Sequence, residues 1–373
     1  MSKKIYIIAA EASADLHTSK IVKTLKIKNP NWEFFGWGGN KMEAEGVKIT
    51  TQYKDVSFMG FLEVIKNIKT IYNLFKKTKK EILQINPDIV LLVDYPGFNL
   101  RIAKWLHEKN ITTYYFISPQ LWAWKEGRIE SIKKYIHKLI VILPFEKTYY
   151  KERNLDVFYA GHPLLDAIKE FKPNVNFREK NKLDCRSIIA LLPGSRKQEI
   201  STMLPLYLSA THKFKKYQLV IAGLSHHKSL YESILTEFPD SKALIVYDQN
   251  YDILHQARIA VVTSGTATLE TALFNIPQVV CYKGNSISYY IAKNLIKIKY
   301  ISLVNLIMDN EIVKELIQYE SNIENIEKEC KKLLDPSTRN TMKQSYKILH
   351  SKLGDGNSIP RIADYLDNEW KNL

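Results

Sequence analysis

Residues 88–94 read Asp-Ile-Val-Leu-Leu-Val-Asp, an uninterrupted apolar run that follows Asn86-Pro87 and is closed by Asp94. Apolar runs of this length, without polar alternation, are typical of strands buried on both faces, as in parallel sheets. A parallel sheet needs helices to cover its faces, so this stretch indicates an α/β protein.

The alternation of strand and helix continues on both sides of this run, in two series. In the first series we expect strands over residues 3–10, 32–36, 88–94, 111–117, 139–143 and 157–160. In the second series we expect strands over residues 187–192, 218–222, 242–246, 259–263 and 278–281. The pattern predicts two doubly wound Rossmann-like domains that face a cleft, with ligands at the carboxyl ends of the strands.

A polar segment, Glu170–Lys182, separates the two series and contains Pro173. The chain has 373 residues, which at about 150 residues per domain corresponds to two domains. We therefore expect an N-terminal domain over residues 1–170 and a C-terminal domain over residues 171–356. The tail, residues 357–373, is predicted to be helical. It can belong to either half, and one option is that it packs back on the N-terminal domain.

The charge of the chain favours anionic partners. Lys and Arg number 54 against 39 Asp and Glu, a formal net charge of +15. A surface of this kind suits nucleic acid, anionic lipid or phosphorylated substrates, although a lysine-rich solvated surface is an equally good explanation. We expect neither a membrane span nor a secretory signal, because the longest apolar runs are short and the first one meets Glu11.

Metal chemistry and disulfides are not expected. Cys185, Cys281 and Cys330 lie far apart and form neither a metal-binding spacing nor a disulfide framework, which fits a reducing cytoplasm. The adjacent His226 and His227 give poor geometry for a metal site.

Two loops in the second half suit a nucleotide. Leu192-Pro193-Gly194-Ser195-Arg196 ends one expected strand and opens a helix, where free N–H groups, a hydroxyl and a guanidinium can hold a diphosphate. Ser264–Glu270 reads Ser-Gly-Thr-Ala-Thr-Leu-Glu after another strand, and its Glu270 can accept hydrogen bonds from a ribose diol. Capped βα turns with surface side chains are the alternative for each loop, but two such loops together favour a nucleotide site.

The first half offers a carboxylate at the end of its most buried strand. Asp94 is well placed there as a general base, since an ordinary aspartate has a pKa of about 3.9 and is ionised at neutral pH. The alternative is that Asp94 caps a helix or is a structural partner for Arg101.

Near the first strand, Ser13 and Asp15 can simply cap the following helix. After residue 117, Gln120 and Trp122 can line a sugar or acyl site or belong to the core.

A basic amphipathic stretch lies between residues 60 and 83. Its apolar side chains fall on one helical arc, which lysines flank, so it can pack on the sheet or contact anionic lipid headgroups. The side chains that we assign to membrane contact are Phe61, Val64, Ile65, Ile68, Ile71 and Tyr72.

These motifs together resemble, in order, the bacterial lipid-A-disaccharide synthase family. The motifs that carry the resemblance are Glu11-Ala12-Ser13, Asp15-Leu16-His17, residues 42–46, Met59-Gly60, Glu63-Val64, Asp94, Phe98-Asn99-Leu100, Ser118-Pro119-Gln120, Trp122-Ala123-Trp124, residues 143–146, Gly161-His162-Pro163, residues 192–196 with Glu199, residues 264–270, residues 300–303 and Asn305-Leu306.

The resemblance implies a GT-B glycosyltransferase that inverts at the anomeric carbon, without metal or other cofactor. It implies transfer from UDP-2,3-diacylglucosamine to 2,3-diacylglucosamine 1-phosphate, giving a β(1→6) disaccharide 1-phosphate and UDP. It also implies peripheral association with an anionic membrane surface, on the cytoplasmic face of the inner membrane, and no nucleic-acid partner.

On this reading Asp94 is the catalytic base. The donor side comprises Ser195, Arg196, Glu199, Ser264, Gly265, Thr266, Thr268, Glu270 and Asn305. The acceptor side or cleft comprises Glu11, Ser13, Asp15, Gln120 and Trp122.

The chain departs from the family pattern at Ala10, Ala14, Gly97 and Lys314, where the family usually has glycine, glycine, aspartate and proline. One alternative is another enzyme of the same fold, either a UDP-sugar 2-epimerase or another UDP-sugar glycosyltransferase. The other alternative is a non-catalytic protein that binds anionic lipid or nucleic acid.

Overall fold

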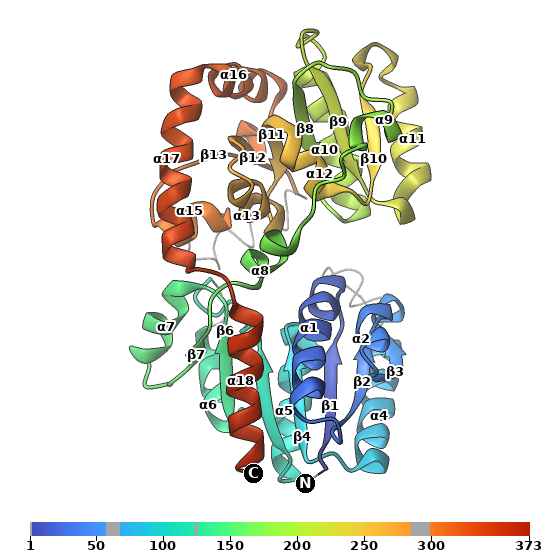
Figure 1. Cartoon of the computed structure of the whole chain (residues 1–373), viewed down its shortest axis with the longest axis vertical. Helices are drawn as coiled ribbons and strands as arrows, with labels where there is room; N and C mark the ends of the chain where they lie inside the picture. Colours follow the sequence, from blue (N-terminus) through green and yellow to red (C-terminus); the bar gives the residue numbers. More distant parts are fainter. Residues whose placement is uncertain (1, 57–67, 124–125, 285–298) are drawn as a thin grey trace. The chain divides into compact units, whose positions relative to one another are not determined.

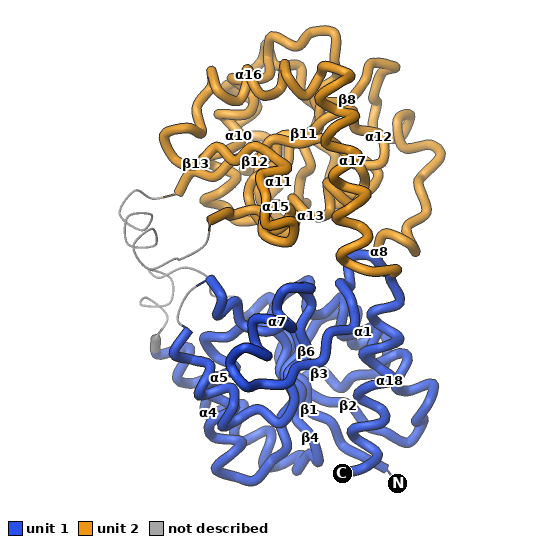
Figure 2. Tube along the Cα trace, turned by 90° about the vertical axis from the view of Figure 1, so that its left-hand side faces the viewer, with its two compact units in different colours: residues 1–166, 356–373 blue, residues 167–355 orange. Residues whose placement is uncertain are grey.

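A computed structural model describes residues 2–56, 68–123, 126–284 and 299–373, without the side chain of Ile68. The chain forms two compact units, shown in different colours in Figure 2. Unit 1 consists of residues 1–166 together with 356–373, and unit 2 consists of residues 167–355.

Unit 1 is built on a seven-stranded sheet in the order β3-β2-β1-β4-β5-β6-β7 (Figure 1). Every pairing in the sheet is parallel. The strands are β1 (Lys4–Ala9), β2 (Glu33–Gly38), β3 (Lys48–Gln52), β4 (Ile89–Val93), β5 (Thr112–Phe116), β6 (Lys138–Val141) and β7 (Phe158–Tyr159). The strand order reverses between β1 and β4, which makes this a doubly wound sheet.

Helices cover both faces of this sheet because alternate strand residues point to opposite sides. Ile5 and Ile7 of β1 pack in one core with α1 and α18, whereas Tyr6 and Ile8 pack in a second core with α5 and α6. The helices of unit 1 are α1 (Ala12–Lys28), α2 (Asn40–Ala44), α4 (Ile68–Ile85), α5 (Pro96–Glu108), α6 (Ile129–Tyr135), α7 (Pro144–Lys151), the start of α8 (Pro163–Glu170) and α18 (Ser358–Lys371).

The last helix, α18, belongs to unit 1 and packs beside α1. Asp166 caps it, since its carboxylate accepts hydrogen bonds from the N–H groups of Ser358 at 3.0 Å and Ile359 at 3.3 Å. At the other end, Trp370 is fully buried, with ring centroids 5.9 Å from Trp32 and 5.7 Å from Tyr114. The final residues of the chain therefore complete the core of its first unit.

Unit 2 is built on a six-stranded parallel sheet in the order β10-β9-β8-β11-β12-β13. Its strands are β8 (Ile188–Leu192), β9 (Gln218–Gly223), β10 (Leu244–Tyr247), β11 (Ala257–Thr263), β12 (Gln278–Tyr282) and β13 (Lys314–Ile317). Its helices are the rest of α8, α9 (Phe177–Lys180), α10 (Lys197–Thr211), α11 (Lys228–Thr236), α12 (Asn250–Gln256), α13 (Thr266–Leu273), α15 (Leu303–Met308), α16 (Ile323–Leu334) and α17 (Pro336–Leu353). The strand order reverses between β8 and β11.

The two reversal points locate the places where ligands bind in such sheets, outside the carboxyl ends of the flanking strands. In unit 1 the flanking strands β1 and β4 lead into Ala10-Glu11 and Asp94. In unit 2 the flanking strands β8 and β11 lead into residues 193–196 and 264–266. The sequence candidates for chemistry therefore gather at the topological switch point of each unit.

Candidate functional site

The loop after β8 is shaped by Gly194, whose φ of +102° favours glycine. A Cβ atom added there would lie 2.5 Å from Oε2 of Glu199. The N–H groups of Ser195 and Arg196 donate to the same Glu199 oxygen at 3.1 and 3.2 Å, and Nη1 of Arg196 lies 2.8 Å from Oε1. The expectation of free N–H groups at these two residues is therefore wrong, because Glu199 in the first turn of α10 caps its own helix.

The loop after β11 presents Gly265 and Thr266 to solvent. Ser264 donates from its hydroxyl to the carbonyl of Ile301 at 3.1 Å. Thr268, by contrast, is fully buried, and its hydroxyl donates to the Gly265 carbonyl at 2.8 Å. Direct donor contact by Thr268 is therefore a wrong prediction, since this hydroxyl serves the helix start instead.

Glu270, one turn further along α13, is partly buried and faces the beginning of α12. Its carboxylate accepts a hydrogen bond from Nδ2 of Asn250 at 3.0 Å and lies 3.5 Å from the hydroxyl of Tyr251. Burial raises the pKa of Glu270 to about 7, against the effect of these two donors. A carboxylate in this setting retains lone pairs that can accept from a further hydroxyl.

Asn305 is a further donor-side prediction that the structure corrects. Its side chain is fully buried and donates to the carbonyl of Val313 at 2.8 Å and to Glu315 at 2.9 Å. Its oxygen accepts from the N–H groups of Ile312 and Val313. All four hydrogen-bonding positions of the amide are thus used inside unit 2, so Asn305 is a structural residue there.

Glu315 was not identified from the sequence, yet it organises the segment beside Ser264. Its carboxylate accepts from the N–H groups of Ile301 and Ser302, both at 2.9 Å, and from the Ser302 hydroxyl at 2.8 Å. Because the Ile301 carbonyl also holds Ser264, Glu315 positions one side of the predicted donor loop. Glu315 lies in the four-residue strand β13, and nothing in the local sequence indicates that it positions this loop.

Asp94 lies directly after β4 in a strained turn. Both Asp94 and Tyr95 have positive φ values, +47° and +49°, which is uncommon for residues other than glycine. The turn is held through the Asp94 backbone carbonyl, which accepts from the hydroxyl of Tyr115 at 2.6 Å and from Nδ2 of Asn99 at 2.7 Å. These bonds leave the Asp94 carboxylate available for chemistry, and strain of this kind is concentrated at functional sites.

The electrostatics of Asp94 suit a base. Burial raises its pKa to about 6, and a hydrogen bond from the Tyr95 backbone partly opposes that shift. The group is still mostly ionised at neutral pH, and its basicity exceeds that of an exposed aspartate.

The predicted acceptor residues near β1 divide into two kinds. Glu11 is half-buried and precedes α1, and Ser13 is exposed in its first turn. Asp15 is buried, and its carboxylate accepts from the N–H groups of Gly39 at 2.7 Å, Lys41 at 3.3 Å and Met42 at 3.1 Å. These bonds cap α2, so the structure gives Asp15 a scaffolding function within unit 1.

The loop after β5 exposes Gln120 and half-buries Trp122. Trp122 donates from Nε1 to Glu146 at 3.2 Å and packs edge-on against Phe145, with ring centroids 5.0 Å apart. Glu146 also caps α7 by accepting from the Leu143 N–H at 2.9 Å, and burial raises its pKa to about 7. Glu146 is a positioning residue. It belongs to the motif at residues 143–146, and an acid in the first turn after Pro144 signals a helix cap.

Of the predicted membrane contacts, Phe61, Val64 and Ile65 lie outside the described residues, as does the side chain of Ile68. Among the others, Ile71 is half-buried and Tyr72 is 58% exposed on α4. The amino group of Lys76 lies 4.7 Å above the Tyr72 ring, so the exposed aromatic is bordered by positive charge.

Within the part of the chain that the structure describes, histidine, cysteine, aspartate and glutamate side chains form no group of three or more able to hold a metal ion. Within the same residues, no helix is both long enough and apolar enough to span a bilayer.

The sequence model of the family described as lipid-A-disaccharide synthetase matches residues 5–366. The chain belongs to this family. The lipid-A-disaccharide synthase of Syntrophus aciditrophicus is 35% identical over 370 residues, covering 97% of this chain and 96% of that protein. The resemblance inferred from the motifs is therefore confirmed.

Solved structures confirm the predicted fold class. The UDP-GlcNAc 2-epimerase of Neisseria meningitidis, bound to UDP-GlcNAc, superposes with a TM-score of 0.66 at 13% identity, covering 98% of this chain and 99% of that one. The glycotransferase of kitacinnamycin superposes with a TM-score of 0.65 at 11% identity, covering 99% of both chains. This family member has the GT-B fold, and at such low identity these likenesses speak to fold alone.

Proposed function

We propose that this chain joins UDP-2,3-diacylglucosamine to 2,3-diacylglucosamine 1-phosphate, forming the β(1→6) disaccharide 1-phosphate and releasing UDP. Family membership over residues 5–366 carries the proposal. The two switch points support it. One carries the partly buried Asp94 carboxylate, and the other carries two loops whose hydroxyl and guanidinium groups suit a diphosphate. We infer that unit 1 takes the acceptor and unit 2 takes the donor.

In unit 2, Ser195, Arg196, Ser264, Gly265 and Thr266 hold the diphosphate of UDP. The positive charge of Arg196 stabilises the negative charge that develops on the departing UDP, in a reaction that needs no metal or other cofactor. Arg196 pairs with Glu199 at 2.8 Å, so Glu199 holds the guanidinium beside the loop. Glu270 accepts a hydrogen bond from the ribose.

In unit 1, Asp94 removes the proton from the 6-hydroxyl of the acceptor while that oxygen attacks the anomeric carbon of the donor. The new C–O bond forms as the bond to the diphosphate breaks, so the configuration inverts from α to β. Glu11 and Ser13 follow β1, whereas Gln120 and Trp122 follow β5, on the two sides of β4. These four residues contact the acceptor sugar. Asp15 supports the same edge by capping α2.

The raised pKa of Asp94 predicts an acid limb in the pH profile. The base works only when deprotonated, so kcat/KM should fall about tenfold per pH unit below about 6, the value to which burial raises this pKa. Steady-state rates measured from about pH 8 down to about pH 5 test this. The Glu146→Gln variant is the control, since it removes a second buried carboxyl and should keep the same limb. A profile without loss of rate down to about pH 5 would exclude Asp94 as the base.

The function itself is tested by UDP release from purified protein. UDP should appear only when donor and acceptor are both present, and in equal amount to the disaccharide phosphate. A UDP-sugar epimerised at C2 in the absence of acceptor would favour the epimerase reading instead.

The chain meets these acylated substrates at an anionic membrane surface, which we place on the cytoplasmic face of the inner membrane. The exposed Tyr72 ring and the Lys76 ammonium above it support this, because aromatic and basic side chains together suit the headgroup region. The predicted patch continues through Phe61, Ile65 and Ile68.

Replacing Phe61, Ile65, Ile68 and Tyr72 with serine should release the protein from anionic vesicles. Each lost aromatic or aliphatic contact removes about 1.5–3 kcal/mol of apolar burial, so binding should fall at least 100-fold. Cosedimentation with vesicles measures the loss, and circular dichroism checks that the variant is folded. Retained binding by a folded variant would show that the membrane contact lies elsewhere.

A further inference from the structure

A groove on the surface of unit 1 lies beside the turn that carries Asp94. It has a volume of about 370 Å³ and is formed by α5, the 3₁₀ turn Glu126–Arg128 and α6. The residues that line it are Pro96, Gly97, Leu100, Arg101, Lys104, Arg128, Ser131 and Tyr135.

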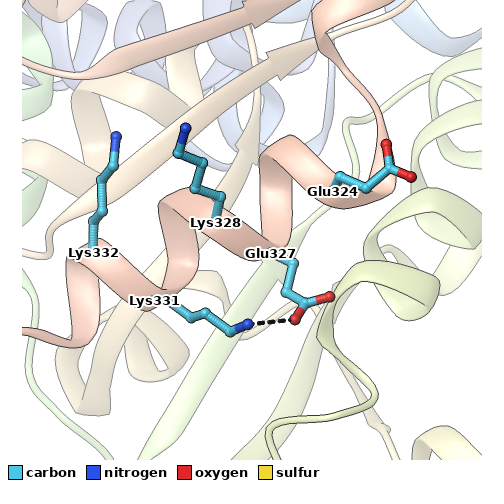
Figure 3. A pocket seen from close by; sticks show the side chains of 5 residues that line it. All are labelled: Glu324, Glu327, Lys328, Lys331 and Lys332. Atoms are coloured by element: carbon cyan, nitrogen blue, oxygen red, sulfur yellow. Dashed lines mark ion pairs between the residues drawn. The ribbon is translucent and has the colours of Figure 1, made fainter.

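The charge of the groove has one sign. Arg101, Lys104 and Arg128 line it, and no acidic side chain of the described residues does. A hollow on α16 differs, because Glu324 and Glu327 share it with three lysines, and Lys331 pairs with Glu327 at 2.7 Å (Figure 3). The lysines of the α16 hollow are accompanied by two carboxylates, whereas the α5–α6 groove is lined by three cationic side chains and no carboxylate of the described residues, which suits an anion.

The groove is contiguous with the proposed base. Pro96 and Gly97 at its end directly follow Asp94-Tyr95 and begin the 13-residue helix α5, whose positive dipole end is also there. The charge of Arg128 also acts on the side chain that holds the Asp94 turn. Burial raises the pKa of the Tyr115 hydroxyl, the Arg128 charge partly opposes that rise, and this hydroxyl donates to the Asp94 carbonyl at 2.6 Å.

We propose that this groove binds the 1-phosphate of the acceptor sugar. The inference rests on the proposed function and names a subsite for it. The acceptor is a phosphate monoester with nearly two negative charges at neutral pH, and its C1 lies one sugar ring away from the hydroxyl that Asp94 deprotonates. An arginine guanidinium can donate two parallel hydrogen bonds to the oxygens of one phosphate, and the Lys104 ammonium adds a further positive charge. A phospholipid headgroup has the same chemistry and is the alternative source of the phosphate.

The test compares two acceptors in detergent micelles, which contain no anionic phospholipid. The wild-type chain should prefer 2,3-diacylglucosamine 1-phosphate over the same lipid without its phosphate. In the Arg101→Ala/Lys104→Ala variant, KM for the phosphorylated acceptor should rise about 10- to 100-fold, the usual effect of losing hydrogen bonds to a charged group. The KM for the donor and the kcat/KM for the dephosphorylated acceptor should stay as in the wild type.

The matched control is Lys109→Ala/Lys151→Ala. It removes the same charge from exposed positions at the end of α5 and on α7, outside the groove. The control should keep the preference for the phosphorylated acceptor. A damaged fold would lower the rates with both acceptors, whereas loss of the phosphate subsite would lower only the rate with the phosphorylated acceptor.

Two results would overturn the inference. One is an Arg101→Ala/Lys104→Ala variant that keeps the wild-type preference for the phosphate. The other is a variant with unchanged micelle kinetics but weakened binding to anionic vesicles, which would assign the groove to lipid headgroups. Failure of the proposed function is distinguishable, because then the wild-type chain itself makes no disaccharide from either acceptor.

Discussion

Asp94→Asn should lower kcat by about 10²–10⁴-fold and leave UDP affinity unchanged. The amide is close in size to the carboxylate but cannot take the proton of the acceptor hydroxyl. The substitution is also conformationally mild, because asparagine tolerates the positive φ of +47° at this position. The bonds from Tyr115 and Asn99 go to the backbone carbonyl and remain in the variant. Turnover kinetics and calorimetric titration with UDP measure the two quantities.

Asp88→Asn is the matched control for this variant. Asp88 lies just before the amino end of the same strand, where it is exposed and accepts from the Lys4 N–H at 2.7 Å. Its loss should leave kcat within a few-fold of the wild type. An Asp94→Asn chain that turns over nearly as fast as the Asp88→Asn chain would contradict the assignment of the base.

Trp370→Ala should reduce the free energy of unfolding of unit 1 by about 3–5 kcal/mol. Trp370 is fully buried between Trp32 and Tyr114, at the end of a helix that completes one core of the unit. All six tryptophans of the chain lie in the residue ranges of unit 1. Tryptophan fluorescence during denaturant unfolding therefore reports on this unit, and its midpoint should move to lower denaturant.

Lys371→Ala is the control for this prediction. Lys371 is half-exposed and pairs at 2.9 Å with the buried Asp367, which keeps its hydrogen bond from Asn29 when the lysine is removed. The exposed ammonium should therefore contribute only about 0–1 kcal/mol. Its removal should barely move the midpoint. An unchanged fluorescence midpoint in Trp370→Ala would mean that α18 contributes little to the stability of unit 1.

The long buried strands were predictable because their sequence pattern is strong. Residues 88–94 and 187–192 are continuous apolar runs, and both contain central strands of their sheets, β4 and β8. The edge strands β3 and β13 were missed. Lys48–Gln52 and Lys314–Ile317 are short and partly polar because one side of an edge strand has no neighbour, so neither reads as a strand.

The candidate loops were predictable for a similar reason. In a parallel sheet every strand ends at the same edge, so residues that directly follow strands gather there without any knowledge of side-chain contacts. The side-chain assignments that failed, Thr268 and Asn305, depend on burial within unit 2. The same types of polar residue form hydrogen bonds to the backbone and bind ligands, so the sequence alone does not tell the two functions apart.

The C-terminal helix shows a further limit of sequence reasoning. Residues 358–371 are amphipathic, which predicts a helix with one buried face but does not say what covers that face. The contacts that decide it are remote, since Asn29 donates to Asp367 at 2.6 Å across 338 positions of the chain. Only the folded chain shows that this helix packs beside α1.

The most direct test of the account is the identity of the product formed from UDP-2,3-diacylglucosamine and 2,3-diacylglucosamine 1-phosphate. Mass spectrometry gives its composition, and NMR gives its linkage and anomeric configuration. We predict a tetra-acyl disaccharide 1-phosphate joined β(1→6), in equal amount to the UDP released and absent when Asp94 is replaced by asparagine. An α-linked product, or UDP release without any disaccharide, would contradict an inverting transfer with Asp94 as its base.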